Sequence, residues 1–537
     1  MPTLLDLPIE LIDDIAVWTA PEGIEGFLLS CKAVYDIGKG HIARHNRYKR
    51  RWKRFSHVHV GDLDERDKLW KRPRTVLQLI REIALDPCIA LYINDLNLYV
   101  PKCLSLSSQK IVKREYNQLR DNGNAMAAIQ SLLARSRHLK KAAQDPDLWL
   151  RRIQLDDQYP GDLGTLFPAA FLLTLLPNVQ KLVLPRDWRS LPHPLRPDRE
   201  YVPRPCLVHE RSEIRRLMDI IVGEAHEPNR TDAALAKLEC VLPNGWEGSL
   251  FFNDGRVLQE VDIFMAMPSI KQLYTYNGNA WNDGWNCTSF RAQYPVASNL
   301  RRAEFLTAYM SADSIAELLT HAPLITCLKY SHMPPNSLSS SQTYCRAGDF
   351  VTAVGKHIGR TLKEFSMTIK PLGNCIIERG VVSMQEFTAL EKAELDVQIF
   401  CGRLPEPGEM ADLSTDRFWL YEQIPCVPDI FPPSIKSLML WTRHRDLELW
   451  HHNVQGLRRL FSHTSEKQSA RLPALEHLAV GFICHHEGRE AEEDEHLREL
   501  KHIVNDLCTA EIQHYDIFAK DKDEYARRFP YLSYDLD

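Results

Sequence analysis

The sequence predicts an α/β protein in which a small all-α segment at the N-terminus precedes an irregular α/β solenoid. Three observations lead to this prediction. Apolar residues recur at helical spacing through the first 35 residues. A short phrase typical of a strand with one buried face then recurs along the rest of the chain. Several stretches that precede this phrase again show helical spacing, so helix and strand alternate.

Composition sets broad limits on the function. With 44% hydrophobic and 26% charged residues over 537 positions, the chain is globular and long enough for several domains or one solenoid. Its formal net charge of −5 is small for this length and argues against nucleic acid as a general partner.

The cysteines and the apolar runs indicate a compartment. The 13 cysteines are odd in number and contain no C-x-x-C pair, as expected of reduced thiols in a cytoplasmic or nuclear protein. Acidic residues interrupt the first apolar run, so no signal peptide is visible. The strongest apolar stretch, Phe167 to Leu176, is too short to span a bilayer, so we expect no membrane partner.

The N-terminal segment, residues 1–45, contains two apolar runs at helical spacing. The first run consists of Leu7, Leu11, Ile15 and Trp18, and the second of Ile24, Phe27, Leu28, Cys31 and Tyr35. Pro8 stands where a first helical turn tolerates proline, and Pro21 and Gly23 separate the two runs, so two or three short helices are expected. So small a segment buries little apolar surface alone, and its open face must dock on the chain or bind a partner.

These residues resemble an F-box of the form common in fungal proteins. The resemblance rests on Leu-Pro-x-Glu-Leu from Leu7, an Ile-Ala step, a proline, and an apolar run that ends in Ser-Cys-Lys-Ala-x-Tyr. It implies that the segment binds the small adaptor subunit of cullin–RING ubiquitin ligases and, through it, a cullin. The residues expected to hold the adaptor by apolar burial are Leu7, Pro8, Leu11, Ile15, Ile24, Leu28 and Cys31.

Two positions depart from the family pattern. Thr19 stands where an apolar residue is usual, and Gly23 where Asp or Asn is frequent. Both lie at the first junction between helices. The alternative to an F-box is an ordinary helical hairpin that belongs to a larger core.

Residues 46–74 are predicted to be a basic helical linker. The stretch from Arg44 to Arg54 is strongly basic, and Tyr48, Trp52 and Phe55 interleave at helical spacing, which predicts a helix with one apolar stripe. The cations could mark nuclear localisation or a nucleic-acid patch. We favour a solvated face on a helix that joins two domains.

Residues 75–537 carry the strand phrase P-x-φ-x-x-L-x-φ, in which φ is apolar. Copies begin at Pro177, Pro268, Pro323 (slipped by one residue), Pro433 and Pro473, and looser copies without proline begin at Leu300, Leu362 and Leu390. The phrase predicts a short strand with one buried face. Because one unit cannot bury its own face, neighbouring units must stack.

The arrangement resembles the irregular leucine-rich repeats that commonly follow an F-box in fungal proteins, although the Asn or Cys of regular repeats is mostly missing. Helices are predicted over 75–84, 126–142, 167–176, 314–319, 349–358, 447–461 and 497–507. Extended chain is predicted over 89–99 and 512–518, and a proline-rich, basic insertion over 185–205. The alternative is a set of unrelated βα units in one α/β domain.

Trp281 and Trp285 lie in a loop that directly follows a strand phrase. Loops that leave the strands of a solenoid lie on one rim and often bind partners, and tryptophan is enriched at interface hot spots. We therefore predict that these two residues contribute to substrate binding. The alternative is that both fold back over the end of a repeat.

The sequence offers no motif for catalysis, a cofactor or a metal. P-loop, G-x-G-x-x-G, G-x-S-x-G and H-E-x-x-H patterns are all missing. His451–His452 and His485–His486 are adjacent and so face different ways, and Cys206-x-x-His209 is only half of a metal site.

These observations lead to a functional expectation. We expect a non-catalytic substrate-recognition subunit of an SCF-type ubiquitin ligase, which binds the adaptor through the F-box and a protein substrate through the repeats. The alternative is a repeat scaffold outside any ligase that uses the F-box-like face for another partner. A hydrolytic or metal enzyme has no motif to support it.

Overall fold

The computed structural model divides the chain into two compact units, Met1–Val241 and Leu242–Asp537. The structure describes residues 4–57, 75–99, 123–156, 166–185, 205–243, 261–276, 279–280, 296–332, 343–369, 375–377, 380–401, 425–443, 456–461, 471–484 and 511–516, except 229, 231 and 262, together with a few isolated positions.

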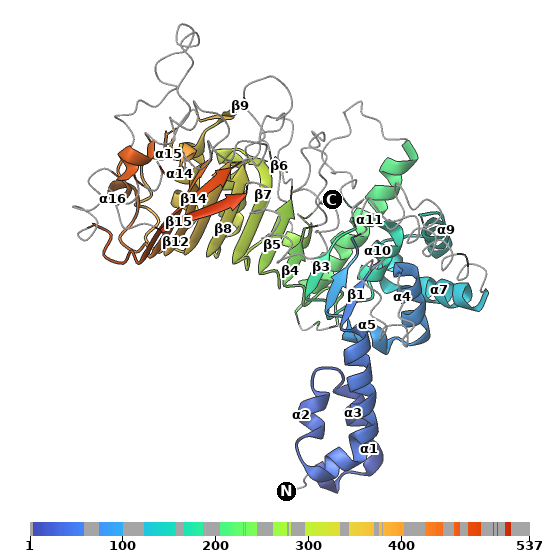
Figure 1. Ribbon diagram of the computed structural model, residues 1–537. Coiled ribbons are helices and arrows are strands. Elements are labelled where there is room, and N and C mark those ends of the chain that lie inside the picture. Colours follow the sequence, from blue (N-terminus) through green and yellow to red (C-terminus); the bar gives the residue numbers. More distant parts are fainter. Residues whose placement is uncertain are drawn as a thin grey trace. The chain divides into compact units, whose positions relative to one another are not determined.

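The first unit begins with three helices, α1 (Ile9–Trp18), α2 (Ile24–Leu28) and α3 (Lys32–Trp52). Helices α1 and α2 pack against α3 (Figure 1). The basic stretch is helical as predicted, and α3 crosses the predicted boundary at residue 45 without interruption. Directly after it, β1 (Arg54–Ser56) pairs in parallel with β2 (Asp95–Asn97). The stretch predicted as a linker therefore contributes the first strand of a sheet.

The rest of the first unit adds helices and two more strands to this sheet. Its elements are α4 (Val76–Leu85), α5 (Cys88–Tyr92), α7 (Gly123–Arg135), α8 (Arg137–Lys141), α9 (Pro146–Asp156), α10 (Leu166–Leu173), β3 (Lys181–Val183), α11 (Pro205–Ala225) and β4 (Cys240–Leu242). The strand order is β1-β2-β3-β4. All eight residues of α10 are buried, as expected of a helix that is apolar on every side.

Two local predictions in this unit need correction. Residues 89–92, predicted as extended, belong to helix α5, where Asp86 Oδ1 accepts the N–H of Cys88 at 3.2 Å. The single helix predicted over 126–142 is broken, because Ser136 Oγ accepts the N–H of Leu139 at 3.3 Å and starts a new helix, α8. In both places a polar side chain satisfies a free backbone N–H and fixes a helix start.

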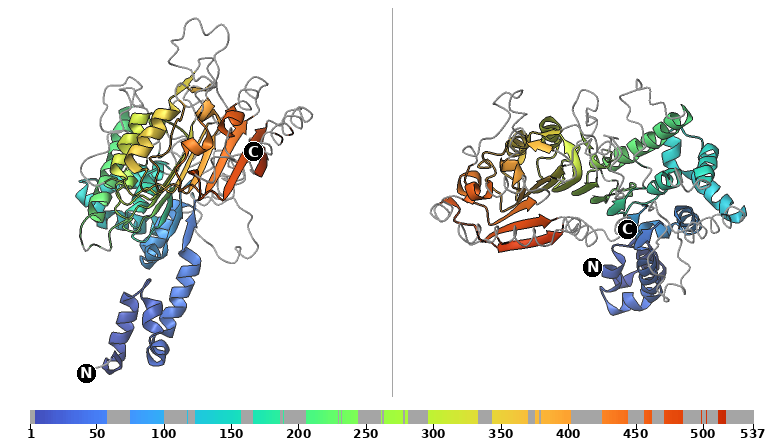
Figure 2. Two further views of the ribbon diagram at one scale, coloured as in Figure 1. Left: turned by 90° about the vertical axis from the view of Figure 1, so that its left-hand side faces the viewer. Right: turned by 45° about the horizontal axis from the view of Figure 1, so that its top comes forward.

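The second unit is built on parallel strands that lie side by side (Figure 2). Its strands are β5 (Gln272–Tyr276), β6 (Asn279–Ala280), β7 (Arg302–Met310), β8 (Cys327–His332), β9 (Thr343–Cys345), β10 (Glu364–Ile369), β11 (Cys375–Ile377), β12 (Lys392–Asp396), β13 (Ser437–Arg443), β14 (His477–Cys484) and β15 (Glu511–Asp516). The main order is β5-β7-β8-β10-β12-β13-β14-β15, β6 pairs with β7, and β9 pairs with β11. Helices α13 (Ala312–His321), α14 (Ala347–Ile358), α15 (Gln398–Cys401) and α16 (Val427–Ile430) lie between strands in the sequence.

All eight copies of the strand phrase form strands of these sheets: β3, β5, β7, β8, β10, β12, β13 and β14. The phrase positions also align in register across the second unit. Leu273, Ala303, Leu328, Phe365, Ala393 and Leu438 are successive partners on neighbouring strands, and each is at most 4% exposed. The predicted α/β architecture of stacked parallel strands with one buried face is therefore confirmed.

Nine of the described strands start with the same hydrogen-bond arrangement. The carbonyl oxygen of Lys271 accepts the N–H groups of both Arg301 and Arg302, at 2.8 and 3.1 Å. Every acceptor of this kind lies one residue before a strand. The same double acceptance recurs at the carbonyls of Lys53, Asn94 and Gln180 in the first unit and of Arg301, Thr326, Lys363, Glu391 and Lys436 in the second. The chain thus repeats in backbone geometry even where the number of residues between strands varies.

Candidate protein-binding face

The three N-terminal helices enclose a small apolar core of their own. Its buried members are Ile12 and Ala16 of α1, Ile24 and Leu28 of α2, and Val34 of α3. Close approach of α2 and α3 depends on Gly38, because a Cβ at this position would lie 2.1 Å from Leu28 Cδ2. Across the core, His41 Nε2 of α3 lies 2.6 Å from Asp13 Oδ1 of α1.

A second apolar stripe of α1 faces solvent. Leu7 is 37% exposed, Leu11 47% and Trp18 86%, with half-buried Ile15 among them. Residues 11, 15 and 18 share one side of a helix because they stand at i, i+4 and i+7. Ile12 and Ala16 occupy the inner side. We call Leu11, Ile15 and Trp18, together with Leu7 just before the helix, the outer stripe of α1.

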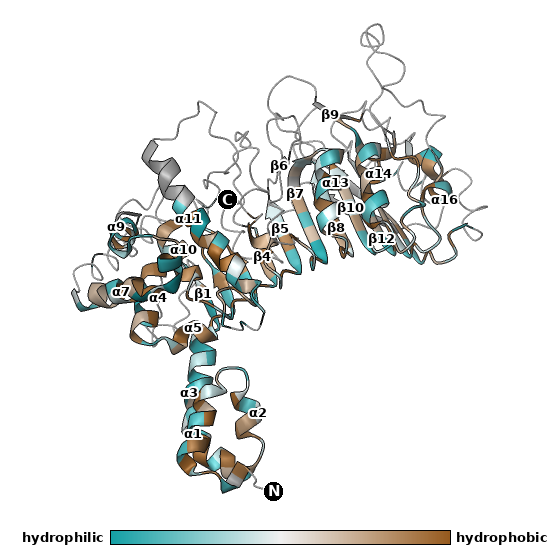
Figure 3. Cartoon of the chain, turned by 180° about the vertical axis from the view of Figure 1, so that it is seen from behind, coloured by the Kyte–Doolittle hydropathy of each residue, from teal (hydrophilic) through white to brown (hydrophobic). Residues whose placement is uncertain are grey.

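More apolar side chains are exposed elsewhere in the N-terminal segment. Of the eleven large apolar residues that are exposed in the described part of the chain, eight lie between Leu4 and Tyr35: Leu4, Leu7, Ile9, Leu11, Val17, Trp18, Leu29 and Tyr35. Figure 3 shows hydrophobic residues along α1 and α2. Such a concentration of exposed large apolar side chains in one short segment is typical of an interaction site.

The seven residues predicted to hold an adaptor fall into two groups. Leu7, Pro8 and Leu11 are exposed and Ile15 is half-buried, so these four are available at the surface of α1. Ile24 and Leu28 are 2% and 0% exposed, and Cys31 packs partly buried against the same core. In the free chain Ile24 and Leu28 therefore support the face from inside and do not form it.

Sequence reasoning did not include Trp18 among the contact residues, although it is the most exposed large apolar side chain of the described residues. Its place in the first apolar run was the available signal. The periodicity could not show whether that run faces inward or outward, because Ile12 and Ala16 fit a helical period equally well.

The two positions that depart from the family pattern contact each other. Thr19 Oγ1 donates to the carbonyl of Ala16 at 3.0 Å, so its hydroxyl is satisfied within α1. The N–H of Gly23 donates to the carbonyl of Thr19 at 2.8 Å, and a Cβ at Gly23 would lie 3.3 Å from Thr19 Cβ. The junction closes around a small residue, so the two departures are compatible with packed helices.

Helix α3 connects this small core to the rest of the first unit through a buried histidine. His45 is 3% exposed, with Nε2 at 3.0 Å from Glu25 Oε1 and Nδ1 at 3.1 Å from the hydroxyl of Tyr92. A carboxylate only accepts, so Nε2 donates to Glu25, and in the neutral imidazole Nδ1 then accepts from the hydroxyl of Tyr92. Burial raises the pKa of Tyr92 to about 12, which keeps its hydroxyl available as a donor.

Further along α3, an apolar stripe packs against the same neighbour. Tyr48 donates a hydrogen bond to Asp86, and its ring lies 5.2 Å from that of Tyr92. Trp52 is 5% exposed. Glu25 also accepts from Lys49 Nζ at 2.7 Å, and the hydrogen bonds of Lys49 and His45 lower the pKa of Glu25. These contacts hold α2, α3 and α5 together.

In the second unit, the aligned buried residues of the strands lie on one face of the sheet. The opposite face carries both basic and acidic side chains. Arg302 lies 2.6 Å from Glu304 and 3.7 Å from Glu364, and Lys392 lies 3.8 Å from Glu364. Arg302 and Lys392 are thus paired with acids, and Arg302 is the single arginine in the described strands β5 to β12, so these strands hold no arginine cluster. Trp281 and Trp285 lie outside the described residues, so their role stays a prediction.

No metal site is found among the described residues: they contain no group of three or more His, Cys, Asp or Glu side chains placed to hold a metal ion. Six cysteines in the described ranges, Cys31, Cys88, Cys240, Cys327, Cys345 and Cys426, are free thiols. Over the same ranges, no helix combines the length and apolar character needed to cross a bilayer.

No protein-family model, curated protein or solved structure matches this chain. The residues themselves are therefore the basis for a proposed function.

Proposed function

We propose that this protein is the substrate-recognition subunit of a cullin–RING ubiquitin ligase, with its N-terminal helices acting as an F-box. The observation that carries the proposal is the outer stripe of α1. Leu7, Leu11 and Trp18 remain exposed although the segment already has a core of its own. A small segment that leaves large apolar side chains in water gains most from a partner that covers them.

The contacts of α3 within the first unit support the same proposal. A receptor of this kind does no bond chemistry and contributes proximity, and an adaptor-binding segment that is anchored to the rest of its own unit serves this role. Helix α3 is continuous over Lys32–Trp52, and buried His45 links it to both Glu25 and Tyr92. In this proposal the parallel-strand repeats, of the leucine-rich type, present a protein substrate, and the chain acts in the cytoplasm or nucleus.

The test is binding of the purified full chain to the ligase adaptor, with variants on the outer stripe. Leu11→Asp and Trp18→Asp place a charge on a surface that the adaptor would bury, while both positions are exposed in the free chain and tolerate a polar side chain. We expect each variant to weaken binding by at least about 30-fold.

The matched control is Leu85→Asp, since Leu85 of α4 is 59% exposed and lies outside the three N-terminal helices. It should bind as the unchanged chain does. Lack of adaptor binding by the folded, unchanged chain would refute the proposal and leave a repeat scaffold that uses this face for another partner.

A further inference from the structure

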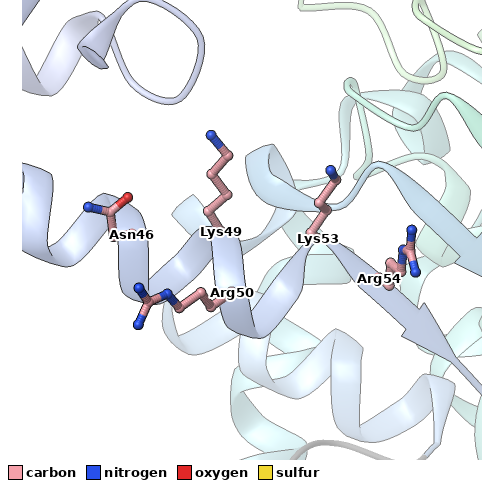
Figure 4. A pocket seen from close by; sticks show the side chains of 5 residues that line it. All are labelled: Asn46, Lys49, Arg50, Lys53 and Arg54. Atoms are coloured by element: carbon pink, nitrogen blue, oxygen red, sulfur yellow. The ribbon is translucent and has the colours of Figure 1, made fainter.

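The second half of α3 carries a basic stripe beside its buried one. One side of α3 and its C-cap carries Asn46, Lys49, Arg50 and Lys53, which stand at i, i+3, i+4 and i+7. Arg54 follows as the first residue of β1. These five residues line an open pocket of about 440 Å³, which we call the α3 basic pocket. Figure 4 shows Lys49 and Lys53 extending from the same side of α3.

The packing of α3 fixes which side faces out. Because His45 and Trp52 are buried and Tyr48 is hydrogen-bonded to Asp86, the helix cannot turn its cations inward. The pocket is therefore a permanent feature of this surface and does not depend on a flexible loop.

Two of the four cations of the pocket already form ion pairs. Lys49 Nζ lies 2.7 Å from Glu25 Oε1, and Arg54 Nε lies 2.9 Å from Asp95 Oδ2. Arg50 and Lys53 are exposed, and within the described part of the chain neither has an acidic partner. The engaged pair is held in position, and the other pair leaves uncompensated positive charge.

The lining residues have the chemistry of a phosphate site. A guanidinium presents a planar pair of donors that matches two phosphate oxygens, a lysine adds a mobile point charge, and an amide adds a neutral donor. The pocket has the size of a small-ligand site. We infer that the α3 basic pocket binds a compact phosphate-bearing anion with two or more negative charges, either free or carried on a protein side chain.

Two alternative roles for the basic stripe fit the structure less well. Cations in the last turn of a helix stabilise its C-terminus, and Lys49 and Arg50 stand in that turn, but this role does not account for Arg54, which lies beyond the helix. A nucleic acid needs contacts to many successive phosphates, whereas Glu25 and Asp95 stand beside the cations and would repel an extended backbone. A compact anion fits between these acids.

The test is calorimetric titration of the full chain at about 0.1 M salt, near physiological screening, with two probes. One probe is sodium tripolyphosphate, and the other is a short peptide with two adjacent phosphoserines, alongside its unphosphorylated form. The pocket variant is Arg50→Gln/Lys53→Gln, which breaks no ion pair of the described residues. The matched control is Lys39→Gln/Arg47→Gln, which removes the same charge from exposed positions of the same helix outside the pocket.

We expect saturable binding that weakens at least about tenfold in the pocket variant and less than about threefold in the control. Tighter binding of tripolyphosphate identifies a free anion as the ligand, and tighter binding of the phosphopeptide with none by its unphosphorylated form identifies a phosphorylated protein. Three results would overturn the inference: no saturable binding of either probe, an equal loss in both variants, or tighter binding of a single-stranded oligonucleotide with affinity that rises with its length. Adaptor binding should be the same in both variants, so this inference and the proposed function fail independently.

Discussion

Gly38→Ala is expected to loosen the N-terminal helices selectively. The added Cβ would lie 2.1 Å from Cδ2 of Leu28, 3.1 Å from its Cδ1 and 3.2 Å from its Cγ, where carbon atoms normally stay about 3.5 to 4.0 Å apart. Leu28 is fully buried in the small core, so it cannot move aside into solvent. The helices α2 and α3 must therefore separate or Leu28 must adopt a strained rotamer.

The magnitude follows from a comparison with Gly40→Ala. Gly40 lies in the same helix, and a Cβ there meets nothing within 4 Å, so alanine should stabilise α3 by about 1 kcal/mol through helix propensity. At Gly38 the same gain is opposed by an overpacking cost of about 1 to 3 kcal/mol. The difference between the two variants, about 1 to 3 kcal/mol, corresponds to about 5- to 150-fold in the opening equilibrium.

Amide hydrogen exchange measured by mass spectrometry can resolve this difference by segment. Peptides from α2 and the first half of α3 should exchange faster in Gly38→Ala than in Gly40→Ala by that factor. Peptides from α14 in the second unit should be unaffected and serve as the internal reference. Equal exchange of α2 in the two variants would refute the argument that Gly38 is required for close helix packing.

Three further predictions concern other parts of the chain. Thr75→Ala removes the capping box at the start of α4 and should cost about 1 kcal/mol of unfolding free energy in urea titrations; no loss would mean that the cap is redundant. His57 accepts the N–H of Val76, and burial lowers the pKa of His57 from 6.5 to about 4. As the pH falls, the unfolded chain therefore binds this proton before the folded chain does, and the folded state loses stability. His57→Asn should reduce the stability loss between about pH 7.5 and 5 by about 2 kcal/mol; an unchanged pH dependence would contradict this. Gly481→Ala would place a Cβ 2.3 Å from the ring of Trp441 and should lower the denaturation midpoint of the second unit by an amount equivalent to about 1 to 3 kcal/mol; an unchanged midpoint would show that the ring has room to shift.

The strands could be predicted from the sequence because their signal is local. In each phrase, alternation places the leucine and the next apolar residue on one face, and that face is buried wherever the strand stacks. Leu328 and Tyr330 of β8 illustrate this, since they are 0% and 1% exposed while Lys329 between them is half-buried. The order of the strands followed from the chain order, as expected when each unit stacks on its neighbour.

The orientation of α1 could not be predicted, because two apolar stripes share the helix. Ile12 and Ala16 face the small core, and Leu11 and Trp18 face solvent, yet both pairs satisfy a helical period. Which stripe is inside depends on where α2 and α3 lie, and this is tertiary information. Short elements were missed for a related reason: α5 has only five residues, and its start depends on the side chain of Asp86.

The backbone junction between repeats explains how such an irregular chain keeps a regular sheet. The carbonyl that accepts two N–H groups belongs to Lys, Asn, Gln, Arg, Thr or Glu in different repeats. This backbone junction therefore does not depend on which side chain stands there. An insertion between two strands leaves this junction intact as long as the two N–H groups at the start of the next strand still donate to the same carbonyl. Natural variation can therefore lengthen or replace the connecting loops one at a time, and new binding specificities can arise at the rim while the strands beneath keep their register.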